Sequence, residues 1–287
     1  MRIVRYASPD AAGGRGAVAR LGRVRGLDVE PLDPADGTPE LMGLIDGAVL
    51  GRLAPVGPDP IAEPLAGVRL LAPLAAPGKV VAIGLNYVDH VAESKATIPA
   101  EPLVFAKFPS SIVGPGEAIT WDPGLTDGVD FEAELGVVIG RPARRVPAER
   151  ALEHVFAYTC LNDVSARDLQ FRDGQWVRGK SLDSFCPIGP WLVTADEIPD
   201  PQALAITCEV SGERLQSAST ADMIFGVAEL IARLSHSFTL EAGDLIATGT
   251  PPGVGWFREP RRVLRDGDDV VVSIERVGRL SNPVRVP

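Results

Sequence analysis

Residues 130–140 of the chain read Asp130-Phe131-Glu132-Ala133-Glu134-Leu135-Gly136-Val137-Val138-Ile139-Gly140, an apolar, strand-like run with two carboxylates two residues apart. Alternate residues of a strand share one face, so Glu132 and Glu134 would lie side by side. On a buried face, two like charges are costly unless a positive charge lies close to both. A divalent cation is the simplest source of that charge. The alternative is a solvated sheet face on which Glu alternates with apolar residues.

A third carboxylate follows the next apolar strand along the chain. The run 157–162 ends in Asn162 and Asp163, and a dense polar segment continues to Gln170. Three carboxylates fill half of an octahedral shell and leave about three positions for water or substrate, which is how proteins usually hold Mg²⁺ or Mn²⁺ for chemistry. We therefore predict that Glu132, Glu134 and Asp163 bind Mg²⁺ or Mn²⁺, whose preferred ligands overlap. The alternative for Asn162 and Asp163 is a turn at the strand end.

The composition favours a strand-rich globular fold. The 287 residues suffice for one large or two modest domains, and the hydrophobic content of 45% excludes a disordered chain. The 30 Gly and 26 Pro separate short apolar runs, which predicts an α+β, mostly β fold. We expect a small N-terminal domain over residues 1–70 and a larger, functional domain over 71–287. The predicted strands are 2–7, 20–29, 80–84, 103–107, 135–140, 157–162, 245–248 and 270–274, and the predicted helices are 38–46, 147–156 and 221–236.

Charge and cysteine usage limit the partners and the compartment. The net charge of -10 speaks against nucleic acid, and a small anionic substrate would need local cations. Cys160, Cys186 and Cys208 lie far apart without a Cys-x-x-Cys motif, which predicts reduced, buried thiols. Because the chain has no apolar stretch of about 18 residues, we expect no membrane contact and a cytoplasmic location.

A candidate general base follows the strand 80–84, in the segment Gly84-Leu85-Asn86-Tyr87-Val88-Asp89-His90-Val91-Ala92-Glu93. His90 and Glu93 are three residues apart, which places them on one face of a helical turn. Glu93 would then orient the imidazole and raise its basicity, so that His90 could deprotonate water. The alternative is an ordinary surface pair on a helix. The other two histidines, His154 and His236, fall in predicted amphipathic helices, and we assign them structural roles.

Two other enzyme classes are disfavoured by their missing motifs. The Gly-rich segment 249–255 contains two prolines, which have no backbone N–H to donate to a phosphate, and its spacing matches no nucleotide-binding fingerprint. The serines show no Gly-x-Ser-x-Gly arrangement, which speaks against a serine hydrolase.

From about Lys79 to its end, the chain resembles the fumarylacetoacetate hydrolase family. Six motif segments occur in the family's order, namely 84–93, 103–116, 130–135, 162–170, 179–190 and 249–255. The chain lacks the additional N-terminal carboxylate ligand and the differently spaced catalytic His that animal fumarylacetoacetases are expected to use. It looks more like the shorter members, which act on acylpyruvates, oxaloacetate or related 2-oxo acids.

The resemblance implies a mixed β-roll or sandwich with peripheral helices, a small N-terminal domain and a homodimer. It also implies Mg²⁺ or Mn²⁺ on Glu132, Glu134 and Asp163. Carried over residue by residue, it gives His90 and Glu93 as the water-activating pair and Lys180 as the catalytic residue that faces the metal-bound substrate. The substrate-binding residues would be Arg167, Gln170, Thr250 and Lys107. We expect the rest of the pocket wall to come from loops at 171–178 and 256–260.

A 2-oxo acid suits these residues because its carboxylate and ketone oxygens can chelate one metal ion. Water deprotonated by His90 and Glu93 could attack the distal carbonyl of a 2,4-dioxo acid and break the bond between C3 and C4, while the metal and Lys180 stabilise the developing charge. We therefore expect a divalent-metal-dependent hydrolase that cleaves a C–C bond and releases pyruvate or another 2-oxo acid.

Two alternatives to the hydrolase remain. The first is a lyase or isomerase of the same family, namely an oxaloacetate decarboxylase, a hydroxydienoate isomerase or a dehydratase of 2-oxo sugar acids. The second is a non-catalytic, metal-stabilised binding protein, which predicts an exposed His90 far from the carboxylates.

Overall fold

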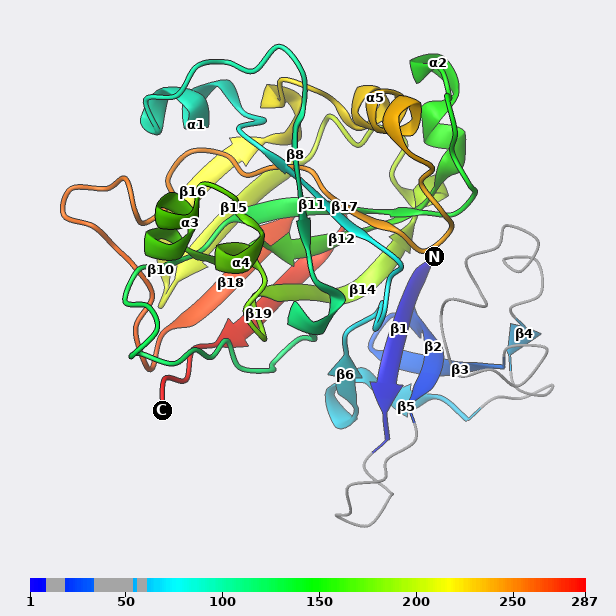
Figure 1. The fold of residues 1–287 in the computed structure, drawn as a ribbon. Coiled ribbons are helices and arrows are strands. Elements are labelled where there is room, and N and C mark those ends of the chain that lie inside the picture. Colours follow the sequence, from blue (N-terminus) through cyan, green and yellow to red (C-terminus); the bar gives the residue numbers. More distant parts are fainter. Residues whose placement is uncertain (9–18, 34–53, 56–60) are drawn as a thin grey trace.

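A long mixed β-sheet runs through the computed structural model, which describes residues 1–8, 19–33, 54–55 and 61–287 (Figure 1). Its strands are β1 (Arg2–Ala7), β2 (Arg20–Arg25), β3 (Asp28–Asp33), β4 (Ala54–Pro55), β5 (Glu63–Pro64), β6 (Arg69–Leu71), β7 (Val80–Gly84), β8 (Leu103–Lys107), β9 (Ile112–Val113), β11 (Ala133–Ile139), β12 (Val155–Asn162), β14 (Cys186–Thr194) and β17 (Leu245–Ala247). Neighbouring strands follow the order β4-β3-β2-β1-β14-β12-β11-β17-β7-β8, and β5, β6 and β9 pair with β3, β1 and β14.

A second sheet packs against the middle of the first. It consists of β15 (Ala205–Val210), β16 (Glu213–Ser219), β18 (Asp269–Ile274) and β19 (Gly278–Pro283), in the order β16-β15-β18-β19. The main hydrophobic core lies between the two sheets, and Leu135, Val137 and Ile139 of β11 point into it. Alternation along the strand puts Glu134 and Val138 on the opposite face, where Val138 joins a second apolar cluster. One face of β11 therefore packs into the main core, and the opposite face carries Glu134.

The helices lie at the periphery of the sheets (Figure 1). Three short ones surround the end of β11 that carries Glu134: α1 (Val88–Glu93), α3 (Arg167–Asp173) and α4 (Val177–Lys180). Elsewhere α2 (Ala148–Ala151) packs on α5 (Val227–Ser237), whose buried face joins the main core. The short pair β10 (Val129–Asp130) and β13 (Ser165–Ala166) links the approach to β11 with the start of α3. Single 3₁₀ turns occupy η3 (Leu65–Gly67), η4 (Pro109–Ser111), η5 (Leu152–His154), η6 (Ala195–Glu197) and η7 (Thr220–Asp222).

The predicted α+β, mostly β fold is confirmed, and most predicted strands of the larger part match within two residues. The single strand predicted over 20–29 is wrong, because a turn at Gly26, whose φ is +60°, splits it into β2 and β3. The helix predicted over 147–156 ends at His154, since Val155 already pairs in β12. The helix predicted over 221–236 begins later, at Val227. The helix predicted over 38–46 lies outside the described residues.

The N-terminal strands extend the main sheet. β1 pairs with β14 through Arg2 opposite Val193 and Ile3 opposite Leu192. Trp191 of β14 packs both against the small cluster around Val4 and Tyr6 and against the main core. A domain boundary near residue 70 stays a prediction.

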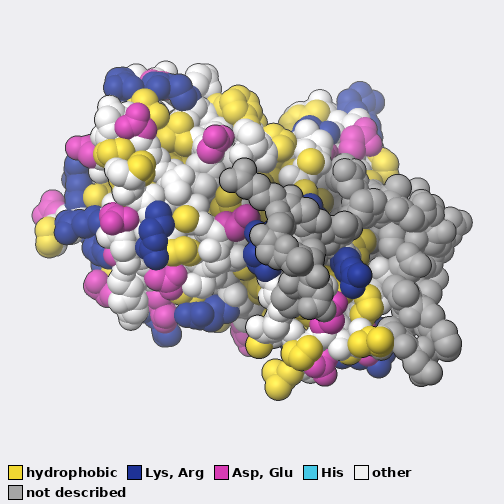
Figure 2. Space-filling model, turned by 90° about the horizontal axis from the view of Figure 1, so that it is seen from below, with side chains coloured by type: hydrophobic (Ala, Val, Ile, Leu, Met, Phe, Trp, Pro, Cys, Tyr) yellow, Lys and Arg dark blue, Asp and Glu magenta, His cyan; other side chains and the backbone are white. Residues whose placement is uncertain are grey.

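The state of the cysteines and the distribution of surface charge can be compared with the predictions from composition. Cys160, Cys186 and Cys208 are free and buried, as predicted, and burial raises the pKa of Cys160 and Cys186 to about 12. On the face shown in Figure 2, acidic and basic side chains intermingle rather than gather by sign. Within the described ranges, no helix has the length and apolar character needed to cross a membrane.

Candidate active site

Two strand ends bring the three predicted metal ligands together. Antiparallel pairing of β11 with β12 places Ala133 opposite Asn162, and the amide of Asp163 donates to the carbonyl oxygen of Glu132 at 2.9 Å. As a result, one carboxylate oxygen from each of Glu132, Glu134 and Asp163 lies within 4.8 Å of the others. All three residues are buried, so the solvated sheet face that we considered for the Glu pair is wrong.

Three buried cations contact this cluster. The Nζ atom of Lys180 lies 2.6 Å from Oε2 of Glu132 and 2.7 Å from Oδ2 of Asp163. The Nζ atom of Lys107 lies 2.6 Å from the other oxygen of Asp163, and it also donates to the carbonyl oxygen of Lys180. Arg167 places Nη2 2.5 Å from Oε1 of Glu132. Glu134 has no ion pair within the described part of the chain, and its Oε2 accepts a hydrogen bond from the amide of Gly249 at 2.9 Å.

Because Glu132 has cationic partners and Glu134 has none among the described residues, the pKa values of the two glutamates shift in opposite directions. Burial, together with the charges of Asp163 and Glu132, raises the pKa of Glu134 well above its ordinary value. Burial acts in the same direction on Glu132, but Arg167 and Lys180 outweigh it and hold the pKa of Glu132 far below its ordinary value. Negative charge is therefore least compensated at Glu134.

The carboxylates fit a hard divalent cation. Carboxylate oxygens are the donors that Mg²⁺ and Mn²⁺ prefer, and the three side chains approach one another closely enough to share one ion. A cation between them would also relieve the repulsion that raises the pKa of Glu134. Glu132, Glu134 and Asp163 are therefore the residues that would hold the ion.

His90 and Glu93 form a pair on α1. The Nδ1 atom of His90 lies 3.1 Å from Oε2 of Glu93, whose Oε1 accepts a hydrogen bond from the amide of Gly253 at 3.0 Å. Because Nδ1 faces the carboxylate, Nε2 is the ring nitrogen left for a water molecule or a substrate. His90 is only 5% exposed, and its ring packs 6.2 Å from that of Phe257. An ordinary surface pair is therefore excluded.

One pocket of about 170 Å³ is lined both by His90 and by Glu132 and Glu134 of the carboxylate cluster. Ligand sites for drug-sized molecules are typically roughly 300–1,000 Å³, so this pocket suits a small acid. Its polar lining includes His90, Glu132, Glu134, Arg167, Gln170, Lys180 and Thr250. Phe171, Trp176 and Phe257 form the apolar wall and lie in the two segments predicted to supply it, although 171–178 is not simply a loop but includes the end of α3 and the start of α4. The exposed, distant His90 that a non-catalytic binding protein predicts is not observed.

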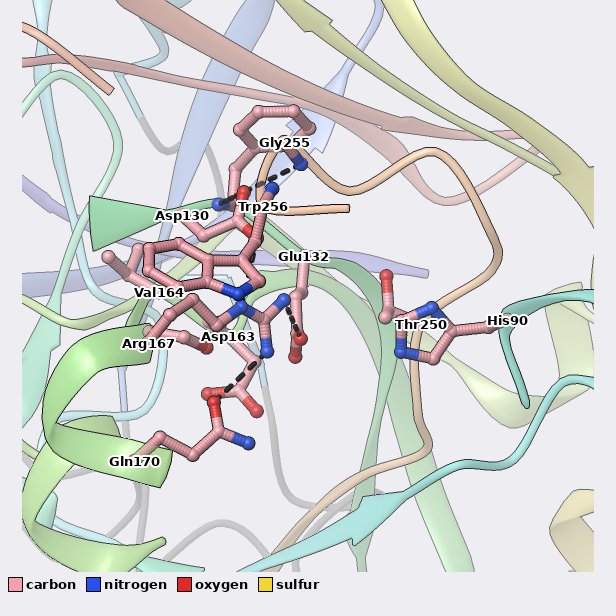
Figure 3. A network of polar contacts seen from close by, with 12 residues as sticks. His90, Asp130, Glu132, Asp163, Val164, Arg167, Gln170, Thr250, Gly255 and Trp256 are labelled. Atoms are coloured by element: carbon pink, nitrogen blue, oxygen red, sulfur yellow. Dashed lines mark hydrogen bonds and ion pairs between the residues drawn. The ribbon is translucent and has the colours of Figure 1, made fainter. Parts of the chain in front are cut away.

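The predicted substrate-binding residues have different positions. Arg167 and Gln170 line the pocket, and Nη1 of Arg167 donates to Oε1 of Gln170 at 3.1 Å (Figure 3). Thr250 also lines it, but its hydroxyl donates to the carbonyl oxygen of Ala133 at 3.0 Å and accepts from Gln216 at 2.8 Å. Lys107 is not among the residues that line the pocket and lies behind Asp163. Their contacts with a substrate stay predictions.

Sequence reasoning missed two buried polar side chains that support the site. Asp130 accepts hydrogen bonds from Arg167 and from the amides of Gly255 and Trp256 (Figure 3). Gln216 of β16 accepts from the amide of Ala133 and donates to Thr250. The alternation that singles out Glu132 and Glu134 also includes Asp130, and that was an available signal. No pattern distinguished Gln216.

The chain is similar to known proteins over most of its length. Residues 79–285 match the family described as fumarylacetoacetate (FAA) hydrolase C-terminal. The human protein named oxaloacetate tautomerase FAHD2A, mitochondrial, is 48% identical over 223 residues, which cover 77% of this chain and 71% of that protein.

Two solved structures are similar over the whole chain. A fumarylacetoacetate hydrolase from Exiguobacterium antarcticum superposes with a TM-score of 0.88 at 40% identity and covers 100% of both chains. A maleylpyruvate hydrolase from Sphingobium sp. SYK-6, in complex with manganese(II) and pyruvate, gives a TM-score of 0.78 at 31% identity over 100% of this chain and 99% of that one.

The matched segment contains the three clustered carboxylates, His90 and Glu93. Two of these relatives are named for 2-oxo acids, oxaloacetate and maleylpyruvate. The chain therefore belongs to the fumarylacetoacetate hydrolase family.

Proposed function

We propose that the protein is a divalent-metal-dependent enzyme that cleaves a C–C bond in a short 2,4-dioxo acid by hydrolysis. One observation carries this proposal: the buried His90, which contacts Glu93 through Nδ1, opens on the same pocket as the carboxylates Glu132 and Glu134. A base and a cation-binding cluster on one small pocket are what hydrolysis of a chelating 2-oxo acid needs.

In this hydrolysis the carboxylate cluster and the pair of His90 and Glu93 have different roles. A Mg²⁺ or Mn²⁺ ion on Glu132, Glu134 and Asp163 would supply the Lewis acid that polarises the 2-oxo group. His90 takes a proton from water through Nε2, and Glu93 stabilises the imidazolium that forms. The oxygen of that water bonds to C4, the electron pair of the C3–C4 bond stays with C3, and His90 returns the proton to C3. The products are a carboxylic acid and pyruvate or another 2-oxo acid.

Lys180 stabilises the negative charge that develops on the leaving 2-oxo acid. Burial would lower the pKa of Lys180, but Asp163 and Glu132 raise it above its ordinary value, so the side chain stays positively charged beside the pocket. A fixed charge in a site shielded from water is the kind of group that contributes most to such catalysis.

A second candidate is keto–enol tautomerisation of oxaloacetate. The 48% identity to the human oxaloacetate tautomerase and the small pocket favour it. In this reaction His90 would carry the proton between C3 and the enol oxygen, so the same base serves both reactions.

Products separate the candidates. The protein is incubated with Mg²⁺ and either 2,4-dioxopentanoate or enol-oxaloacetate, the reaction is followed by proton NMR, and released CO₂ is measured separately. Pyruvate and acetate in equal amounts support hydrolysis, faster ketonisation of oxaloacetate supports tautomerisation, and CO₂ release supports the decarboxylase alternative. The matched variants are His90→Ala and His236→Ala, of which His236 is exposed on α5. Equal rates in both variants would contradict any role of His90.

We also propose a homodimer and a cytoplasmic location. β8 ends the main sheet as an edge strand and exposes Leu103 and Val104, a surface that soluble proteins usually cover. A second copy is the simplest cover, and sedimentation of a monomer at micromolar concentration would contradict it. Fractionation of the source cells tests the location, which differs from the mitochondrial one in the name of the human relative.

A further inference from the structure

The carboxylate of Asp130 connects two parts of the site that are far apart in sequence. Its Oδ1 accepts from the amides of Gly255 at 2.8 Å and Phe131 at 3.0 Å. Its Oδ2 accepts from Nε of Arg167 at 2.9 Å and from the amide of Trp256 at 3.1 Å. Asp130 is fully buried and does not line the pocket, so it acts only through these partners.

The first partner of Asp130 is the loop 249–257, which carries one wall of the pocket. Besides the two amides that Asp130 holds, the amide of Gly249 donates to Glu134 and the amide of Gly253 donates to Glu93. Phe257 of the same loop packs against His90. The loop therefore contacts a metal-site carboxylate at Gly249, and it contacts the base and its partner at Phe257 and Gly253, nearer to the two amides that Asp130 holds.

The second partner of Asp130 is Arg167, which faces the pocket from α3. Arg167 contacts Asp130 through Nε, Glu132 through Nη2 and Gln170 through Nη1. Because Oε1 of Gln170 accepts from Arg167, the amide nitrogen of Gln170 points away from the guanidinium and can donate a hydrogen bond elsewhere. In the view of Figure 3, Gln170 and His90 lie on opposite sides of Glu132.

We propose that Asp130 is a positioning residue that fixes the loop 249–257 and the Arg167–Gln170 pair in a single arrangement. In that arrangement the base His90 and the donor Gln170 face a bound acid from two walls of the pocket. A carboxylate is required because all four partners are donors. An amide at this position would point its own NH₂ group at one pair of donors, whichever way it turns. The effect on turnover rests on the proposed function, whereas the effect on the loop does not.

Hydrogen exchange of the full chain tests the effect on the loop. The variant is Asp130→Asn and the matched control is Asp244→Asn, since Asp244 is also buried and accepts from Lys79 and the amide of Glu241 without touching the loop. Loss of a charge-assisted hydrogen bond predicts exchange at least about tenfold faster in fragments covering 253–257 of Asp130→Asn, and unchanged exchange there in Asp244→Asn. Unchanged exchange in Asp130→Asn, or equal acceleration in both variants, would overturn the proposal.

Kinetics test the effect on the site. With Mn²⁺ and 2,4-dioxopentanoate, Asp130→Asn should lose about 10-fold to 100-fold in kcat, with the Kd for Mn²⁺ alone changed less than threefold. A loosened loop with unchanged kcat would overturn the positioning role. Should the wild type turn over no 2-oxo acid, the proposed function fails, and the exchange result alone supports or overturns the role of Asp130.

A measurement on the wild type covers the case in which Asp130→Asn does not fold. The amide of Gly124 donates to the exposed Asp122, as the amide of Gly255 donates to the buried Asp130. If Asp130 holds the loop, the amide of Gly255 exchanges at least about 100-fold more slowly than that of Gly124 by NMR. Similar rates would overturn the proposal.

Discussion

Lys107 and Asp163 form an ion pair of 2.6 Å in which both side chains are wholly shielded from solvent. Lys107 also donates to the carbonyl oxygens of Lys180 and Val164. It therefore holds a predicted metal ligand against the segment that carries Lys180. This position gives Lys107 a measurable structural effect, and its contact with a substrate stays a prediction.

Lys107→Met should destabilise the protein strongly. Removing one partner of a buried pair costs about 3–5 kcal/mol, and the loss here should lie at the lower end of that range because Asp163 keeps its contact with Lys180 at 2.7 Å. Arg178→Met is the matched control, because Arg178 and Asp173 also lie 2.6 Å apart but at the surface, where ion pairs contribute little. The measurement is urea unfolding in the presence of a chelator. Similar losses of free energy of unfolding in the two variants would contradict the account.

His90→Ala should lower kcat by about 10²–10⁴, the usual contribution of a general base. Glu93→Gln should lower it less, because the amide oxygen can still accept from one of the two donors, Gly253 or His90, although the negative charge and one hydrogen bond are lost. Steady-state kinetics with Mn²⁺ measure both effects, and Mn²⁺ affinity should be unchanged in each. A larger loss of kcat in Glu93→Gln than in His90→Ala would show that the assignment of the base is wrong.

Gly253→Ala should damage the site as well as the fold. Gly253 has a φ of +104°, and a Cβ atom there would clash with the carbonyl oxygen of Leu215. Gly212 is a control with a φ of +84° and open space around it. Gly212→Ala should cost about 1–2 kcal/mol from backbone strain alone. Gly253→Ala should cost about 1–3 kcal/mol more and lower kcat, because the clash displaces the backbone amide that donates to Glu93. Equal unfolding free energies and equal kcat in the two variants would contradict this.

The carboxylate of Asp268 should make stability depend on pH. Burial acts to raise the pKa of Asp268, but hydrogen bonds from Arg262 and Ser211 outweigh it and hold that pKa below its ordinary value. A lowered pKa in the folded state stabilises the protein above the unfolded value of about 3.9, and this stabilisation is lost as the pH falls through the folded value. Asp268→Asn should therefore cost about 1 kcal/mol at pH 7, after allowance for solvent screening, and progressively less below pH of about 4. Thermal unfolding across pH measures the difference, and a constant difference would contradict the assignment.

The part of the site that sequence predicts best is the part with regular alternation. Glu132 and Glu134 interrupt a run whose other residues are buried, so the spacing alone placed them on one face of a strand. Asp163 was predictable as a strand-end residue, and the pairing of β11 with β12 then brings it to Glu132. The distance of three residues between His90 and Glu93 likewise fixed their contact on one turn of helix.

Contacts between distant segments were not predictable from one sequence. Gln216 reaches Thr250 from the second sheet. Strands β16 and β19 were not predicted because their apolar residues show no strict alternation, and β14 because prolines interrupt it. β15 was missed although its apolar residues do alternate with polar ones. Asp130 lay inside the quoted run, but its role depends on where the loop 249–257 returns to it. A lysine at the end of a strand is usually solvated, but Lys107 is buried because β8 ends directly against Asp163.

The central claim is that Glu132, Glu134 and Asp163 hold the cation on which turnover depends, and Glu134→Gln tests it most directly. The side-chain amide of the new glutamine keeps an oxygen that can accept from the amide of Gly249, and the substitution removes the negative charge that the cluster compensates least. The variant should therefore fold in the presence of a chelator, with a Tm equal to or above that of the wild type. The measurement is Mn²⁺-dependent turnover of a 2-oxo acid by this variant beside the wild type. The account predicts that turnover falls by at least about 100-fold, since one of three ligand charges is lost. Turnover that survives unchanged in Glu134→Gln would contradict it.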